Sequence, residues 1–228
     1  MHAILAIGNG EVAVLRIVFG QDGSCESTLV TRVALSDIKL LSCQVAWHEI
    51  SDGNISFDIL AGNGRAEMIK ATYVEGQGID AEAKVVFKAD QKIQFTAVQR
   101  LTQVDRLVCG DTRGHLWLFD YSTGEKLYSV KSHADRITGL DMRQEDGAII
   151  ASSKDSFVNV YSCDASASSL AKQESVKCSA LTIIYEVNGT RMLGFNGLYC
   201  LFWDREQDLC LLKVNTKGGN RPVRAWYG

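Results

Sequence analysis

The sequence is almost without proline and has no long apolar run. Pro222 is the single proline among 228 residues, so little in the chain interrupts strand pairing. No apolar stretch approaches the roughly 18 residues that a membrane-spanning helix needs. Residues 1–7 also lack the basic segment of a secretory signal and lead directly into a Gly-Asn-Gly turn. These features predict a soluble intracellular protein with no membrane partner.

Paired cysteines, metal-ligand spacing and excess charge are also missing. The seven cysteines form no Cys-x-x-Cys pair and are odd in number, which favours a reduced compartment, the cytoplasm. The four histidines show no ligand spacing, so we expect no metal and no cofactor. The formal net charge of -3 gives no global electrostatic case for nucleic-acid binding. Any such role has to be local or shared with a partner.

The chain does contain a recurring pattern, in which two β-rich runs are joined by a tight turn of Gly, Asn, Asp or Ser. The clearest copies span residues 107–120 and 149–162, and a third spans 192–204. Weaker copies centre on residues 8–10 and 62–64. Their apolar residues alternate or run continuously, which indicates strands and not helices.

The spacing of these turns predicts the fold class. Successive markers are separated by 54, 48, 42 and 42 residues when the first residue of each turn is counted, at Gly8, Gly62, Gly110, Ser152 and Gly194. A period of about 40–45 residues is typical of WD-repeat propeller blades, whereas helical arrays have shorter periods. We therefore predict an all-β fold, an incomplete WD-repeat β-propeller of about four blades, each a four-stranded antiparallel sheet.

Laying the strands out from the turns gives approximate blade units. We expect them at residues 1–20, 28–73, 84–120, 126–162 and 170–204, with 205–228 starting a further blade. In this layout an outer strand comes first, an inner strand and two more strands follow it, and 74–83 is a connecting loop. The pattern begins and stops inside a unit, which predicts a fragment of a longer protein with unpaired sheet edges.

One polar constellation lies within the clearest unit. His133, Ser152, Asp155 and Tyr161 match the hydrogen-bond network of WD repeats, in which a loop His, a strand Ser or Thr, a turn Asp and a strand aromatic tie one blade together. A Ser-His-Asp set also occurs in hydrolases. No nucleophile elbow or oxyanion hole surrounds Ser152, so we interpret the set as structural and expect no catalytic residue.

A second candidate region is basic and lies near the C-terminus. No acidic residue follows Asp208. Basic and aromatic side chains gather there beside a Gly-Gly-Asn run, namely Lys213, Lys217, Arg221, Arg224 and Trp226. Such groups hold phosphates and stack on a base, which makes them a candidate RNA or partner contact. The alternative is a solvated outer strand and loop.

Two stretches carry a family resemblance. Residues 107–114 and 192–214, the latter followed by Gly218-Gly219-Asn220 and Arg224-Ala225-Trp226, resemble the large WD-repeat protein that partners the tRNA wobble-nucleotide 2′-O-methyltransferase. That family carries a Gly-rich segment and then His-Arg-x-Trp; here Asn220 stands near the family's His. The resemblance implies a non-catalytic subunit that binds the methyltransferase and helps to place the tRNA anticodon loop.

Two other classes stay open. A generic WD-repeat scaffold for signalling or complex assembly, which binds other proteins through propeller faces, fits the acidic balance of the chain. An enzyme in its own right is the third class. The sequence shows no S-adenosylmethionine loop and no base set for a ribose hydroxyl, so the chemistry is expected to reside in a partner.

Overall fold

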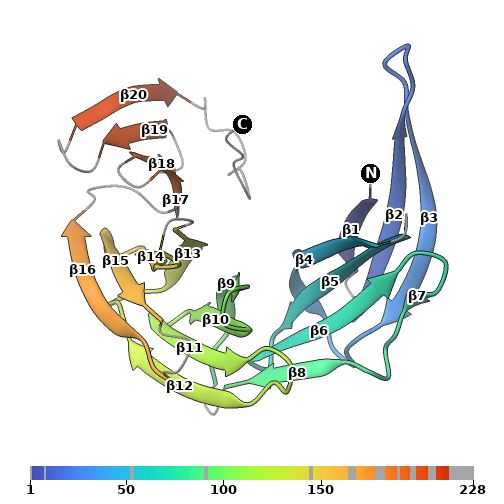
Figure 1. Ribbon diagram of the computed structural model, residues 1–228, viewed down its shortest axis with the longest axis horizontal. Coiled ribbons are helices and arrows are strands. Elements are labelled where there is room, and N and C mark those ends of the chain that lie inside the picture. Colours follow the sequence, from blue (N-terminus) through green and yellow to red (C-terminus); the bar gives the residue numbers. More distant parts are fainter. Residues whose placement is uncertain are drawn as a thin grey trace. The chain divides into compact units, whose positions relative to one another are not determined.

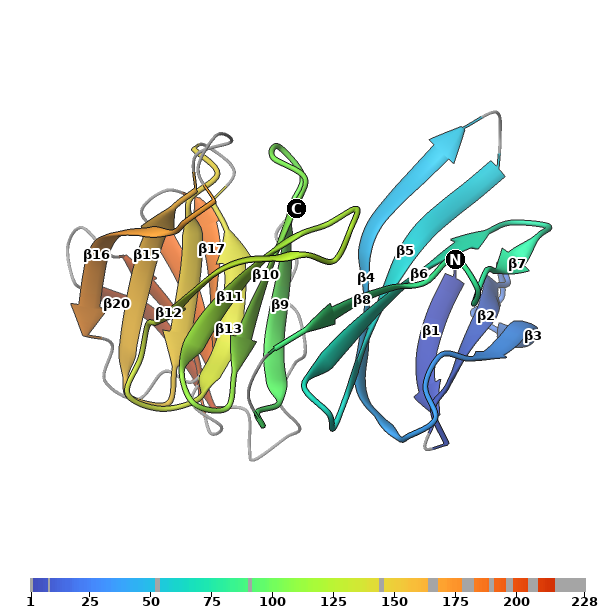
Figure 2. The same cartoon turned by 90° about the horizontal axis from the view of Figure 1, so that it is seen from below.

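A computed structural model describes the chain in ten stretches. These are residues 2–7, 9–51, 54–89, 92–143, 146–163, 168–177, 183–188, 191–195, 199–204 and 209–215, with side chains described for 9–41, 55–89, 92–143, 146–163 and 168–177. All regular structure in these stretches is β-strand (Figure 1 and Figure 2). No helix long and apolar enough to cross a membrane occurs among them.

The chain divides into two compact units. Unit 1 comprises Met1–Phe95 and Ser122–Glu125, and unit 2 comprises Thr96–Tyr121 and Lys126–Gly228. Each unit is built from antiparallel sheets whose strands follow one another along the chain. Short turns favour this arrangement, because antiparallel neighbours need only a tight connection.

Unit 1 holds two sheets. The first has three strands, β1 (His2–Ile7), β2 (Glu11–Phe19) and β3 (Cys25–Ala34). The second has five, β4 (Leu40–Ser51), β5 (Asn54–Asn63), β6 (Glu67–Val74), β7 (Gly78–Ile79) and β8 (Val85–Lys88). Both β7 and β8 pair with β6.

Unit 2 holds three four-stranded sheets. The first contains β9 (Phe95–Leu101), β10 (Arg106–Asp111), β11 (His115–Asp120) and β12 (Lys126–Lys131). The second contains β13 (Ile137–Met142), β14 (Ile149–Ser153), β15 (Phe157–Ser162) and β16 (Ala171–Lys177). The third contains β17 (Ile183–Asn188), β18 (Arg191–Phe195), β19 (Tyr199–Asp204) and β20 (Leu209–Asn215).

The sheets are offset by one strand from the expected units. The strand at 126–131 pairs with β11 and so closes the preceding sheet instead of opening the next one. In the same way β3 pairs with β2, which divides the expected unit 28–73 between two sheets. The strand at 209–215 pairs with β19 and completes the sheet of the fifth expected unit, 170–204, instead of starting a further one. The expected loop 74–83 contains the short strand β7.

Apolar packing explains why the central strands read as continuous hydrophobic runs. Every residue of β14 is buried, as are the last five residues of β10. In unit 2 the core cluster includes Val108, Leu118 and Ile137, each with no exposed surface. Unit 1 has its own cluster, in which the rings of Phe57 and Tyr73 stack with centroids 4.7 Å apart. Each unit thus positions its turns on a packed core of its own.

Candidate functional site

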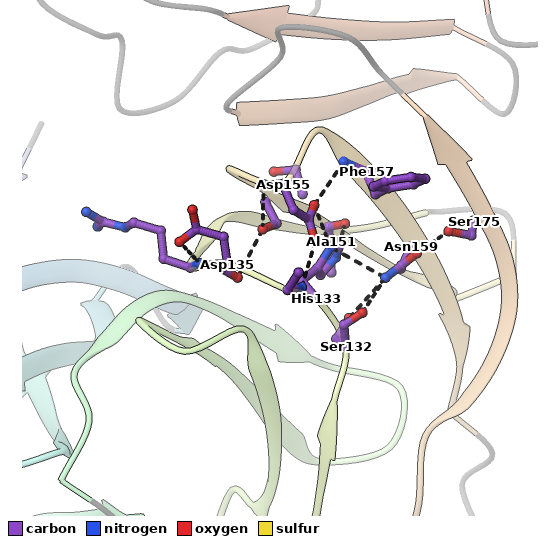
Figure 3. Close-up of polar contacts among 12 residues, drawn as sticks. Ser132, His133, Asp135, Ala151, Asp155, Phe157, Asn159 and Ser175 are labelled. Atoms are coloured by element: carbon purple, nitrogen blue, oxygen red, sulfur yellow. Dashed lines mark hydrogen bonds and ion pairs between the residues drawn. The ribbon is translucent and has the colours of Figure 1, made fainter.

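The polar constellation of unit 2 centres on a histidine and an aspartate. His133 lies in the loop between β12 and β13, and Asp155 lies in the turn between β14 and β15. The imidazole Nδ1 lies 3.1 Å from both carboxylate oxygens of Asp155, and Nε2 lies 3.1 Å from the carbonyl oxygen of Ala151. Figure 3 shows these contacts joining the loop to the turn. The predicted neighbours His133 and Asp155 are therefore in direct contact.

The backbone fixes Asp155 in place. Its carboxylate accepts hydrogen bonds from the amides of Ala134 at 2.8 Å and Phe157 at 2.9 Å. A carboxylate that accepts several amide protons is a strong acceptor with a defined orientation. The aspartate thereby connects the loop that carries His133 to its own turn.

Burial and hydrogen bonding shift the pKa of both groups downward. Burial lowers the pKa of His133, and the neighbouring Asp155 carboxylate only partly opposes this. Burial raises the pKa of Asp155, but the amides of Phe157 and Ala134 and the His133 ring outweigh it, so the pKa lies below its usual value. At neutral pH the pair is therefore a neutral imidazole beside a carboxylate. A neutral imidazole has a single N–H, so His133 donates either to Asp155 or to the Ala151 carbonyl and not to both. The contact is a buried hydrogen bond and not an exposed ion pair.

Tyr161 joins the constellation through a different partner. Its hydroxyl donates to Ser132 Oγ at 2.9 Å. Asn159, two residues earlier on β15, donates to the carbonyl of Ser132 at 2.7 Å and accepts from Ser175 Oγ at 2.7 Å. The network thus runs from the loop across β15 to the outer strand β16. The sequence prediction missed Ser132, Asn159 and Ser175, although a polar Asn in an otherwise apolar strand was a usable signal.

Ser152 lies apart from this network. Its hydroxyl is 3.3 Å from Thr138 Oγ1 and 3.4 Å from the carbonyl of Gly139. Side chains alternate between the two faces of a strand, and it is the neighbour Ala151 that contacts His133. Within the described residues Ser152 forms no hydrogen bond to His133, so the nucleophile and base of a hydrolytic triad are not joined.

A second polar centre, which the sequence prediction also missed, lies in the sheet of β9 to β12. Asp111 is completely buried. Its carboxylate accepts hydrogen bonds from the Arg113 amide at 2.7 Å, the His115 amide at 2.9 Å and the Trp117 indole at 2.8 Å. All three donors lie in the following turn or strand, so this aspartate holds the β10–β11 hairpin together.

Corresponding residues in two other sheets bond to their turns in the same way. Asn63 accepts from the amide of Arg65 at 2.9 Å, and Ser153 accepts from the amide of Asp155 at 3.2 Å. Like Asp111, each bonds an amide two residues further along, as in Asx and Ser/Thr turns. The repeated turn is therefore a structural device of the fold.

The C-terminal candidates stay a prediction. Lys213 lies on β20, whose side chains are not described, and Lys217, Arg221, Arg224 and Trp226 lie outside the described residues. No group of three or more His, Cys, Asp or Glu side chains that could hold a metal is present in the described part of the chain.

Comparison with known proteins identifies the fold. No protein-family model and no curated protein sequence matches the chain. Among solved structures the chain is similar to the β-propeller domain of Myceliophteria thermophila Cps50 (Swd1), with a TM-score of 0.66 and 15% identity over 94% of this chain and 70% of that chain. The predicted all-β fold, a β-propeller, is therefore confirmed.

Proposed function

We propose that this chain is a non-catalytic propeller scaffold that binds other proteins through its blade faces. The observation that supports the proposal is that His133 contacts Asp155 inside the blade and does not face solvent. Both imidazole nitrogens face acceptors inside the blade, and the side chain is fully buried. A general base has to reach a substrate proton, and this histidine is instead committed to holding a loop against a turn.

The more specific proposal is that the scaffold serves a tRNA 2′-O-ribose methyltransferase in the cytoplasm. The resemblance of residues 107–114 and 192–214 to the accessory subunit of the wobble-nucleotide enzyme supports it. The partner would supply the methyl transfer. This chain would hold the enzyme and the anticodon loop in register, because orientation of two reactants contributes strongly to rate.

Affinity purification of the tagged chain followed by mass spectrometry and RNA sequencing tests this proposal. We expect a 2′-O-methyltransferase and tRNA to be recovered together. Arg224→Ala should reduce recovery of tRNA, whereas Lys39→Ala, a change at an exposed loop of unit 1, should not. Recovery of other proteins without a methyltransferase would contradict the specific proposal and favour the generic scaffold for signalling or complex assembly.

A further inference from the structure

Exposed basic side chains gather at one end of two neighbouring sheets of unit 2. They come from the β10–β11 turn, the β12–β13 region, the β14–β15 turn and the end of β16. We name this surface the basic face and define it by the exposed residues Arg113, Lys131, Arg136, Lys154 and Lys177 together with Phe157.

Backbone contacts show that these segments adjoin one another. The Lys131 ammonium donates to the carbonyl of Arg113. The Lys154 amide donates to the carbonyl of Arg136 at 3.1 Å. Lys177 lies directly opposite Phe157 in the pairing of β15 with β16. The basic residues therefore belong to one continuous surface.

The basic face carries positive charge although the whole chain has a formal charge of -3. The acidic groups beside it are Asp111, Asp135 and Asp155, of which Asp111 is completely buried. The Asp155 carboxylate is already bound by two amides and faces His133, and its side chain is only 12% exposed. Asp135 accepts from the amide of Arg136 at 2.6 Å and is exposed. Five cations thus face solvent against one freely exposed carboxylate.

Phe157 gives this surface an aromatic platform. It is 39% exposed and is the one large hydrophobic side chain in the described part of unit 2 with such exposure. Its amide is tied to Asp155, and its ring extends away from that carboxylate (Figure 3). Cross-strand pairing places Lys177 beside the ring. Exposure of a phenyl ring costs free energy, which a ligand that stacks on it would recover.

We infer that the basic face binds single-stranded RNA. Lysine and arginine side chains contact the phosphates, and a base stacks on Phe157. An aromatic platform among cations is the chemistry of sequence-tolerant single-strand binding. An acidic peptide would use the cations but not the ring. The inference goes beyond the scaffold role, because it assigns RNA contact to residues other than the C-terminal group and needs no methyltransferase.

Fluorescence anisotropy of the full chain with a short labelled oligouridylate tests the inference. Phe157→Ala should weaken binding about tenfold, because one stacked base contributes of this order. Lys154→Ala should make the plot of log affinity against log salt shallower by about 0.7, the value for one phosphate contact on a single strand. The matched controls are Phe19→Ala, an exposed ring in unit 1, and Lys172→Ala, an exposed lysine on the same strand as Lys177. Both controls should bind like the wild type.

Two outcomes would overturn the inference. One is no binding of the oligouridylate, and another is equal binding by Phe157→Ala. If polyglutamate also displaces the RNA in the second case, the basic face is assigned to an acidic peptide. Affinity purification with the Phe157→Ala variant measures separately whether the methyltransferase is still recovered. If the enzyme is recovered but the RNA does not bind, the inference fails and the proposed function stands.

Discussion

Two carboxylates of unit 2, those of Asp111 and Asp155, lie where strands meet turns and accept hydrogen bonds from backbone amides. Asp111 and Asp155 each accept two amide protons in this way. An amide buried without a partner costs about 1–3 kcal/mol. Each of these carboxylates therefore matters more for stability than an ordinary surface charge does.

Replacement of Asp111 tests this directly. Asp111→Ala removes the acceptor of two amides and of the Trp117 indole, and we expect a loss of about 3 kcal/mol or more in the free energy of unfolding. Asp37→Ala is the control, because Asp37 is 72% exposed in its ion pair with Arg65. It should cost less than about 1 kcal/mol. Urea unfolding measures both, and similar costs for the two variants would refute the assigned role of Asp111.

The His133 pKa predicts how stability depends on pH. Burial lowers this pKa in the folded protein from its usual value of 6.5, so the unfolded chain takes up the proton at a higher pH than the folded protein does. The stability contributed by neutral His133 is therefore complete above pH 6.5 and declines as the pH falls through the folded-state pKa. Wild type should lose more stability than His133→Gln between about pH 8 and about pH 5. Unfolding curves that stay parallel for the two proteins would contradict this.

The match to the WD-repeat hydrogen-bond network predicted the contact of His133 with Asp155, which the structure shows at 3.1 Å. It did not predict which strand residue lies beneath the ring. Ala151 and Ser152 differ by one position and hence by one face of the strand. Asn159 and Ser175 were missed because their contact depends on the register of β15 against β16.

Among the elements, the hairpin turns share one conformation. A residue with positive φ occupies the same place in four of them, namely Gly10, Ala66, Gly114 and Ser156. In two hairpins the carbonyl of this residue accepts hydrogen bonds from two successive amides in the loop that follows the outer strand. The carbonyl of Gly114, for example, accepts from Ser132 and His133. The turn and the next sheet are thereby joined.

Opposite effects are expected at two of these positions. A Cβ on Gly114 would overlap the carbonyl oxygens of His133 and Asp135, so Gly114→Ala should cost about 2 kcal/mol or more. Ser156 already bears a side chain at a φ of 69°. Ser156→Gly relieves that strain but adds freedom to the unfolded chain, so we expect a gain of up to about 1 kcal/mol. Thermal unfolding compares the two, and a gain from Gly114→Ala would rule out the proposed turn geometry.

The sequence predicted the existence of the strands better than their membership of sheets. Alternation and continuous apolar runs mark a strand locally. The sheet to which an outer strand belongs depends on whether it pairs with the strand before it or with a strand of the next repeat. The repeat pattern in the sequence is the same in both cases. The connections before and after β12, residues 121–125 and 132–136, are equally long. Only the observed pairing of β12 with β11 settles its sheet.

For the whole molecule, the all-β propeller was predictable because a repeated period is visible without any knowledge of contacts. The charge distribution was not. The five cations of the basic face come from segments up to 64 residues apart, Arg113 to Lys177, and only the fold brings them together. The negative net charge of the whole chain gave no indication of this local cluster of cations.

Wobble-nucleotide ribose methylation is the most direct measure of the proposed role. Cells that lack this protein should lose 2′-O-methylation at the tRNA wobble position, and its re-expression should restore the methylation. The methyltransferase level should be followed in parallel, so that loss of the enzyme itself is distinguished from loss of its placement. Unchanged wobble methylation in the deleted cells would contradict the proposed tRNA function.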